Sequence, residues 1–119
     1  MSLPHPSTVP PQVAPVEADS MAASGEAVLL DVREQGEYAA GHAPGAVWLP
    51  LIALAAGAEP PAAGRTVLAI CRSGNRSQRA VDLLAARGVT AVNVTGGMHA
   101  WAEAGLPVVT AEGADGQVI

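Results

Sequence analysis

The chain has 119 residues and a formal net charge of −5, with 50% apolar and 14% charged residues. This composition excludes wholesale disorder, the length allows one domain with a modest core, and the acidic balance argues against nucleic acid as a partner. No apolar run approaches the ~20 residues of a membrane span, so we expect no membrane association.

The single cysteine excludes an internal disulfide and leaves one free thiol, which fits a reducing compartment. No basic region followed by an apolar segment, typical of a secretory signal, is visible near the N-terminus. We therefore expect a cytoplasmic protein. The six basic residues are all arginine, and with the many Ala, Gly and Pro residues they suggest a GC-rich bacterial genome.

The chain divides into a central domain and two tails. Residues 1–11 are rich in proline and are predicted to be extended or disordered. Residues 12–108 carry the apolar pattern of a folded domain. Residues 109–119 are acidic and rich in glycine, and we expect them to fray.

Short apolar runs alternate with helical segments along this domain. Strands are expected at 12–13, 27–30, 46–49, 66–70 and 90–94, and helices at 17–24, 34–40, 51–56, 77–87 and 98–104. Such alternation is typical of a parallel sheet with helices on both faces. The sequence therefore predicts a three-layer α/β/α domain, in which ligands bind at the carboxyl ends of the strands.

Cys71 lies at such a strand end. It follows the apolar run 66–70 and opens the polar loop Cys71-Arg72-Ser73-Gly74-Asn75-Arg76, after which a helix is expected from Ser77. Backbone amides of a tight loop and a helix start attract negative charge, and Gly74 lets the loop turn without a Cβ clash. We predict an anion cradle with a thiolate in its floor.

The same amides, with the two arginines of the loop, are expected to lower the pKa of Cys71 from about 8.5 into the range of roughly 3.5–7.5. The thiolate would then act as a nucleophile. The alternative is a small buried apolar residue, since a free cysteine is often only that. A core cysteine does not need an arginine on each side of a glycine loop, so we favour the nucleophile.

Four segments together resemble the single-domain rhodaneses, which are sulfurtransferases that carry sulfur as a cysteine persulfide. The segments are Leu29-Leu30-Asp31-Val32-Arg33-Glu34 with Glu37-Tyr38, then Gly41-His42-Ala43-Pro44-Gly45-Ala46, the loop from Cys71 to Ser77, and Gly96-Gly97 followed by Trp101. They span nearly the whole domain in the order that the family has. The resemblance implies a five-stranded parallel sheet with strand order 1-5-4-2-3.

The resemblance also implies roles for the loop. Cys71 matches the residue that becomes persulfidated, and the residues that match the substrate-binding part are Arg72, Ser73, Gly74, Asn75 and Arg76. The implied donor is a small anion such as thiosulfate. The implied acceptor is cyanide or a thiol, including that of a thioredoxin-like or sulfur-relay protein. Neither a metal nor an organic cofactor is implied.

Several neighbouring residues are expected to support the site. Asp31 ends a strand and either orients the loop or binds a backbone amide, and Arg33 and Glu37, four residues apart, are expected to form an ion pair. We expect His42 to tie down the segment before Pro44 rather than to act as a base.

Trp48 and Trp101 are expected in the core. Two-domain thiosulfate enzymes generally carry a cation where this chain has Ser73 and an arginine where it has Glu37. Both differences weaken the case for thiosulfate as the physiological donor.

Two other functions compete with sulfur transfer. A cysteine phosphatase or arsenate reductase needs five residues between the cysteine and the arginine, but four separate Cys71 from Arg76. A persulfide carrier or a regulatory binding module that serves a partner protein is the closer alternative, although inactive relatives usually lose the cysteine. The sequence leaves the carrier and the free-standing enzyme open.

Overall fold

The computed structural model describes residues 12–119. The strands are β1 (Gln12–Val13), β2 (Ala27–Asp31), β3 (Val47–Trp48), β4 (Thr66–Ile70) and β5 (Ala91–Val94). The helices are α1 (Pro15–Ala23), α2 (Gln35–Ala40), α3 (Leu51–Ala55), α4 (Asn75–Ala86) and α5 (Gly97–Glu103). The expectation of an extended or disordered segment at 1–11 lies outside the described residues.

The five strands form one parallel sheet in the order β1-β5-β4-β2-β3, which confirms the predicted topology. The longest pairing joins β2 and β4, where Asp31 is the register partner of Ile70. Because parallel strands end at the same edge, the residues that follow them gather there. Cys71 comes directly after β4 and so lies beside the end of β2.

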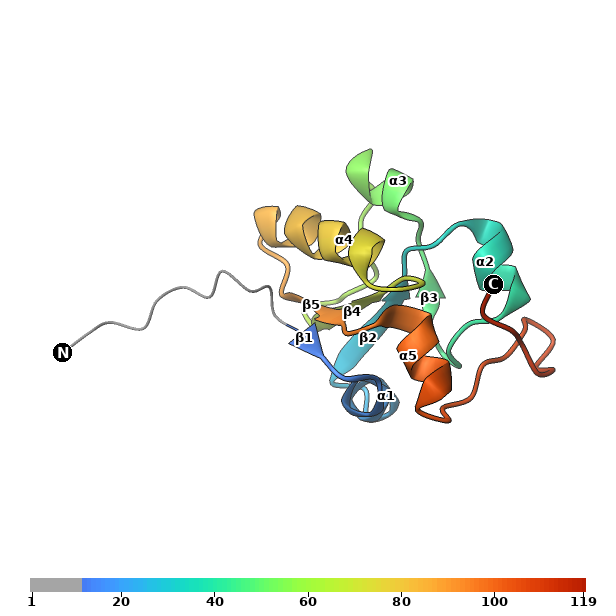
Figure 1. Cartoon of the computed structure of the whole chain (residues 1–119). Helices are drawn as coiled ribbons and strands as arrows, with labels where there is room; N and C mark the ends of the chain where they lie inside the picture. Colours follow the sequence, from blue (N-terminus) through green and yellow to red (C-terminus); the bar gives the residue numbers. More distant parts are fainter. Residues whose placement is uncertain (1–11) are drawn as a thin grey trace.

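Helices cover both faces of the sheet (Figure 1). One core lies on the side of α1 and α5 and contains Leu29, Leu68 and Trp101. The second lies on the side of α3 and α4 and contains Leu30, Val67, Leu84 and, at its edge, Cys71. Alternate residues of the same strand enter opposite cores, as the period of a strand requires, and both cores hold the strand ends in place.

Helix α4 begins two residues earlier than the sequence predicted. Gly74 is its N-cap, with φ of 114°, and Asn75 and Arg76 belong to its first turn instead of to the loop. The left-handed backbone at this position favours glycine because a Cβ atom would be strained there. The turn from strand to helix is therefore very short, and it brings the amide of Gly74 back toward Cys71.

The segment 109–119, which we expected to fray, is hydrogen-bonded to the domain. Val109 exchanges backbone hydrogen bonds with His42, and the Gln117 amide donates to the carbonyl of Ala40 at 2.9 Å. Figure 1 shows this end of the chain beside α2. Close approach is possible because Gly41 has no side chain: a Cβ there would lie 2.5 Å from the backbone of Gln117. Composition alone could not reveal this complementarity.

Within residues 12–119, no helix combines the length and the apolar character that crossing a membrane requires.

Candidate active site

Backbone hydrogen bonds from the first turn of α5 hold the loop that follows β4. The backbone amides of Met98 and His99 donate to the carbonyl oxygens of Cys71 and Arg72, at 2.7 and 3.1 Å. Gly97 has φ of +60°, and a Cβ at this position would collide with both carbonyl groups. A glycine is thus needed where the first turn of α5 meets the loop, which gives the Gly96-Gly97 pair a structural reason.

Cys71 Sγ lies in a polar environment although the residue is only 1% exposed. The Gly74 amide donates to Sγ at 3.1 Å, and Ser77 Oγ lies 3.2 Å from it. Both partners come from the start of α4. Since a purely apolar cysteine would have no such partners, the geometry favours the nucleophile over the small core residue.

The hydrogen bonds outweigh burial in setting the acidity of this thiol. Burial raises the pKa of Cys71. Hydrogen bonds lower it by more than burial raises it, and they come from the Ser77 side chain and from the backbone amides of Ser77, Gly74 and Ser73. The pKa of Cys71 is therefore below its ordinary value. The lowering comes from neutral hydrogen-bond donors around the sulfur, and not from the two loop arginines that the sequence analysis expects to contribute.

Asn93 on β5 supports this geometry, and its only signal in the sequence is that a polar residue stands inside an apolar strand. Its Oδ1 accepts the single Ser77 hydroxyl proton at 2.6 Å beside the neutral thiol, so this hydroxyl has to turn toward Sγ to stabilise the thiolate. Its Nδ2 donates to the Gly74 carbonyl at 3.1 Å. Asn93 is 5% exposed. It therefore holds both residues that contact Cys71 Sγ, from the opposite side of the loop.

Arg76 does not point freely into the cradle. Its guanidinium binds Glu37 on α2 through two hydrogen bonds, Nη1 to Oε1 at 2.6 Å and Nη2 to Oε2 at 2.8 Å. This pair holds the pKa of Glu37 at about 2, with the Arg76 hydrogen bonds as the largest cause. The ion pair that we expected between Arg33 and Glu37 is therefore wrong, because the fold brings Arg76 to the same carboxylate.

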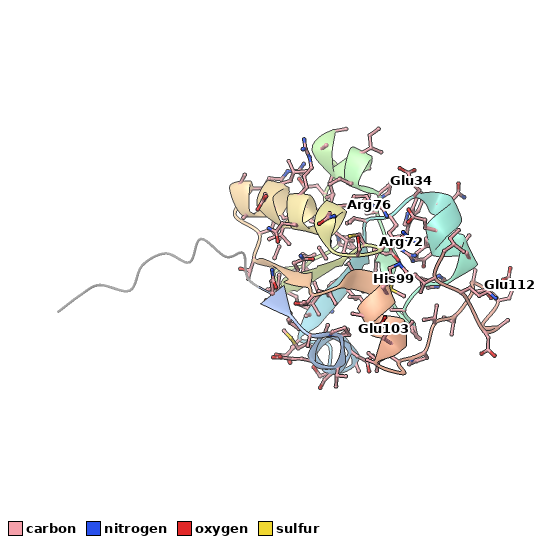
Figure 2. The ribbon with its side chains drawn as sticks, viewed as in Figure 1. Glu34, Arg72, Arg76, His99, Glu103 and Glu112 are labelled. Atoms are coloured by element: carbon pink, nitrogen blue, oxygen red, sulfur yellow. The ribbon has the colours of Figure 1, made fainter. Side chains whose placement is uncertain are left out.

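Arg72 is the more exposed of the two arginines. Its Nε donates to the main-chain oxygen of Ile119 at 2.9 Å. Figure 2 shows Arg72 and Arg76 on the side of the molecule where α2 and the start of α4 meet. Ser73 and Asn75 are exposed beside them. The two arginines therefore differ in their partners: Arg76 is bound to Glu37, and Arg72 to the main chain of Ile119.

Asp31 and Arg33 form a fully buried ion pair. Arg33 Nη2 lies 2.7 Å from Asp31 Oδ2 and also donates to the Gly41 carbonyl at 2.8 Å. The Arg33 backbone amide donates to Asp31 Oδ1, which fits the expected amide pairing of that carboxylate. These contacts fasten the segment after β2 to the end of α2, and within residues 12–119 none of them reaches the loop 71–76.

The aromatic residues and His42 are structural. His42 Nδ1 lies 2.8 Å from the Tyr38 carbonyl, and the two rings stack with centroids 3.9 Å apart. This arrangement ties down the segment before Pro44. Trp101 is buried in the core, whereas Trp48, expected there too, is half-buried and donates to the Arg33 carbonyl.

Metal binding has no support in the described part of the chain, where no three His, Cys, Asp or Glu residues are grouped to hold an ion.

Comparison with known proteins gives a consistent family. Residues 14–104 match the rhodanese-like domain. The chain is 37% identical over 94 residues to a protein of Allochromatium vinosum named sulfurtransferase, covering 78% of this chain and 88% of that one. It is 36% identical to an uncharacterized protein of Synechocystis sp. over 86% of this chain but only 58% of that relative, so it spans less than two thirds of that protein.

Comparison with solved structures gives the same family. A rhodanese-related protein from Thermoplasma volcanium matches with a TM-score of 0.72 and 29% identity, covering 83% of this chain and 97% of that one. A rhodanese-like domain protein from Staphylococcus aureus matches with a TM-score of 0.69 and 30% identity, covering 76% and 90%. The fold, the loop that follows β4 and these matches together show that the chain belongs to the rhodanese-like domain family.

Proposed function

We propose that this protein is a sulfurtransferase that moves a sulfane sulfur from a small anionic donor to a thiophilic acceptor through a persulfide on Cys71. The observation that carries the proposal is the hydrogen bonding of Cys71 Sγ to the Gly74 amide and Ser77 at a strand end. The lowered pKa of the thiol supports it, since the thiolate is the attacking species. The relative named sulfurtransferase supports the reaction class.

The first half-reaction loads the cysteine. The Cys71 thiolate attacks the outer sulfur of thiosulfate, the bond between the two sulfur atoms of the donor breaks, and sulfite leaves with the electron pair. The amides of Ser73 and Gly74 are directed at Cys71 Sγ and stabilise its negative charge before it attacks. The product is the Cys71 persulfide anion.

The second half-reaction empties the cysteine. A thiolate or cyanide attacks the outer sulfur of the persulfide, and Cys71 leaves as the thiolate that the loop already stabilises. The same donors thus serve Cys71 as nucleophile and as leaving group. A thioredoxin-like or sulfur-relay protein would supply the acceptor thiol in the cell, and a persulfide carrier would use the same steps with a protein on either side.

Phosphate transfer fits the site less well. The turn is one residue shorter than a phosphatase loop needs, and Arg76, which would have to wrap the phosphate, is already bound to Glu37. The guanidinium that such a reaction requires is therefore not free.

Thiocyanate production from thiosulfate and cyanide tests the proposed function. The wild type should turn over, and Cys71→Ser should produce no thiocyanate above the uncatalysed rate, because no other cysteine exists in the chain. Turnover that persists in Cys71→Ser would overturn the persulfide route. Matching melting temperatures would show that the variant retains the fold.

A further inference from the structure

The ion pair between Glu37 and Arg76 is held more firmly than a pair of surface side chains. Glu37 Oε1 also accepts the backbone amide of Glu34 at 3.1 Å, so α2 fixes the carboxylate at its own first turn. Arg76 is fixed in the first turn of α4. The side chain of Glu37 is 17% exposed and that of Arg76 is 36% exposed. The pKa of Glu37 is about 2, which keeps its carboxylate charged at neutral pH.

We propose that Glu37 is a specificity-determining positioning residue: by holding Arg76 it withholds this cation from the donor, and the site therefore favours sulfane-sulfur donors of low charge over dianions such as thiosulfate. The inference rests on the proposed function of Cys71 and narrows its donor. Glu37 acts through Arg76 and need not touch the donor itself.

Charge balance at the loop supports this. A donor must approach a thiolate, so a dianion meets twice the repulsion that a monoanion meets unless nearby cations compensate it. The pKa of Arg76 is raised chiefly by its hydrogen bonds to Glu37 and to a smaller extent by the charge of Cys71, so Arg76 lies within electrostatic reach of the thiolate while the adjacent Glu37 offsets its charge. Arg72 remains, exposed to solvent and screened. Backbone amides are then the main groups that donate hydrogen bonds near Cys71 Sγ. Because they carry no net charge, they compensate a monoanionic sulfur donor better than a dianionic one.

Thiosulfate and methanethiosulfonate form a matched pair of probes. In both, the Cys71 thiolate attacks the outer sulfur, the sulfur–sulfur bond of the donor breaks, and the Cys71 persulfide anion forms. Sulfite dianion leaves from thiosulfate and methanesulfinate monoanion leaves from methanethiosulfonate, each with the electron pair. The two donors differ by one charge, because a methyl group replaces one anionic oxygen.

The experiment compares kcat and KM for both donors in the wild type, Glu37→Gln, Glu34→Gln and the double variant Glu37→Gln with Arg76→Gln. Glutamine at position 37 can still accept the Glu34 amide, so the helix start is kept. Glu34→Gln removes the same charge from the same end of α2, but Glu34 makes no ion pair with Arg76 within the described residues. Melting temperatures verify that each variant folds.

We expect the wild type to prefer methanethiosulfonate. Glu37→Gln should raise kcat/KM for thiosulfate about tenfold, as one charge-assisted contact becomes available, and should do so through KM. The gain for methanethiosulfonate should be smaller. Glu34→Gln should change the preference by less than about twofold. The double variant should lose the gain, because Arg76 supplies it.

An unchanged donor preference in Glu37→Gln would overturn the inference. So would an equal change in Glu34→Gln, which would mean a general charge effect, or a gain that survives in the double variant. The proposed function fails on a different result, namely that neither donor loads Cys71 in the wild type.

Discussion

Cys71 is buried among apolar side chains, yet its sulfur is contacted by a hydroxyl and a backbone amide. Burial alone would oppose a thiolate, and the hydrogen bonds reverse that tendency. At the scale of residues, the account therefore depends on Ser77 and Gly74 more than on the arginines.

Ser77→Ala should raise the pKa of Cys71. It removes the side-chain hydrogen bond, the largest cause that lowers the pKa of this thiol, while burial continues to raise it. Thiolate ultraviolet absorbance against pH, with Cys71→Ser as the blank, reports the change. Ser73→Ala is the matched control, because it keeps the backbone amide that acts on the sulfur. A titration of Ser77→Ala identical to that of the wild type would contradict the assigned cause.

The two arginines should differ when truncated. Arg72→Ala should lower kcat/KM for thiosulfate with little change in melting temperature, since Arg72 is exposed. Arg76→Ala should instead lower the free energy of unfolding, by about 1 kcal/mol for a partly screened pair, because Glu37 loses its partner, and should leave kcat/KM for thiosulfate nearly unchanged. Chemical denaturation measures this. Equal stability losses in the two variants would contradict the separation of roles.

The acid side of the stability profile gives an independent check of the same pair. The folded pKa of Glu37 is depressed to about 2, so its contribution to stability is fully present above its ordinary pKa of 4.5 and is lost as pH falls toward 2. Arg76→Ala should therefore converge on the wild type in stability as the solution is acidified through this window. A difference that is constant across it would argue against an ionic origin.

At the scale of elements, three segments meet at the loop: α4 supplies donors, β5 supplies Asn93, and the first turn of α5 holds the carbonyls of Cys71 and Arg72. The order of strands and helices was predictable because apolar runs and glycines mark it in the sequence. The pairing of Arg76 with Glu37 was not, because 39 residues separate them and only the packed sheet brings α2 next to α4. Arg33 forms its ion pair with the buried Asp31, two residues before it, instead of with Glu37.

Gly97→Ala should destabilise the protein by more than Gly105→Ala. Both glycines have a left-handed backbone, with φ of +60° and +78°, but a Cβ at Gly97 would collide with the Cys71 and Arg72 carbonyls, whereas one at Gly105 meets nothing within 4 Å. The backbone strain of about 1–2 kcal/mol is common to both, and steric overlap should add about 1–3 kcal/mol at Gly97. Urea denaturation compares them. Equal losses would mean that α5 does not clamp the loop.

At the scale of the whole molecule, the end of the chain folds back on α2 and reaches the site face through the Arg72 contact with Ile119. The acidic and glycine-rich composition of 109–119 gave the opposite expectation. Composition describes the average tendency of a segment, whereas the backbone bonds to Ala40 and His42 depend on glycines at Gly41 and elsewhere that let two chains approach.

Gly41→Ala should release this end of the chain. The new Cβ would lie 2.5 Å from the Gln117 backbone, and the expected cost is about 1–3 kcal/mol. Gly36→Ala is the control, because a Cβ there meets nothing within 4 Å. Limited proteolysis with mass analysis should show faster cleavage after residue 109 in Gly41→Ala only. Unchanged cleavage and stability would contradict the packing of the tail.

The intact mass of the protein after incubation with a sulfane-sulfur donor tests the persulfide on Cys71 most directly. Thiosulfate and methanethiosulfonate are used separately, excess donor is removed, and the protein is measured before and after addition of cyanide. We predict a gain of the mass of one sulfur atom with at least one donor, its loss on cyanide treatment, and no gain in Cys71→Ser. A wild-type mass that neither donor changes, or a gain that persists in Cys71→Ser, would contradict the account.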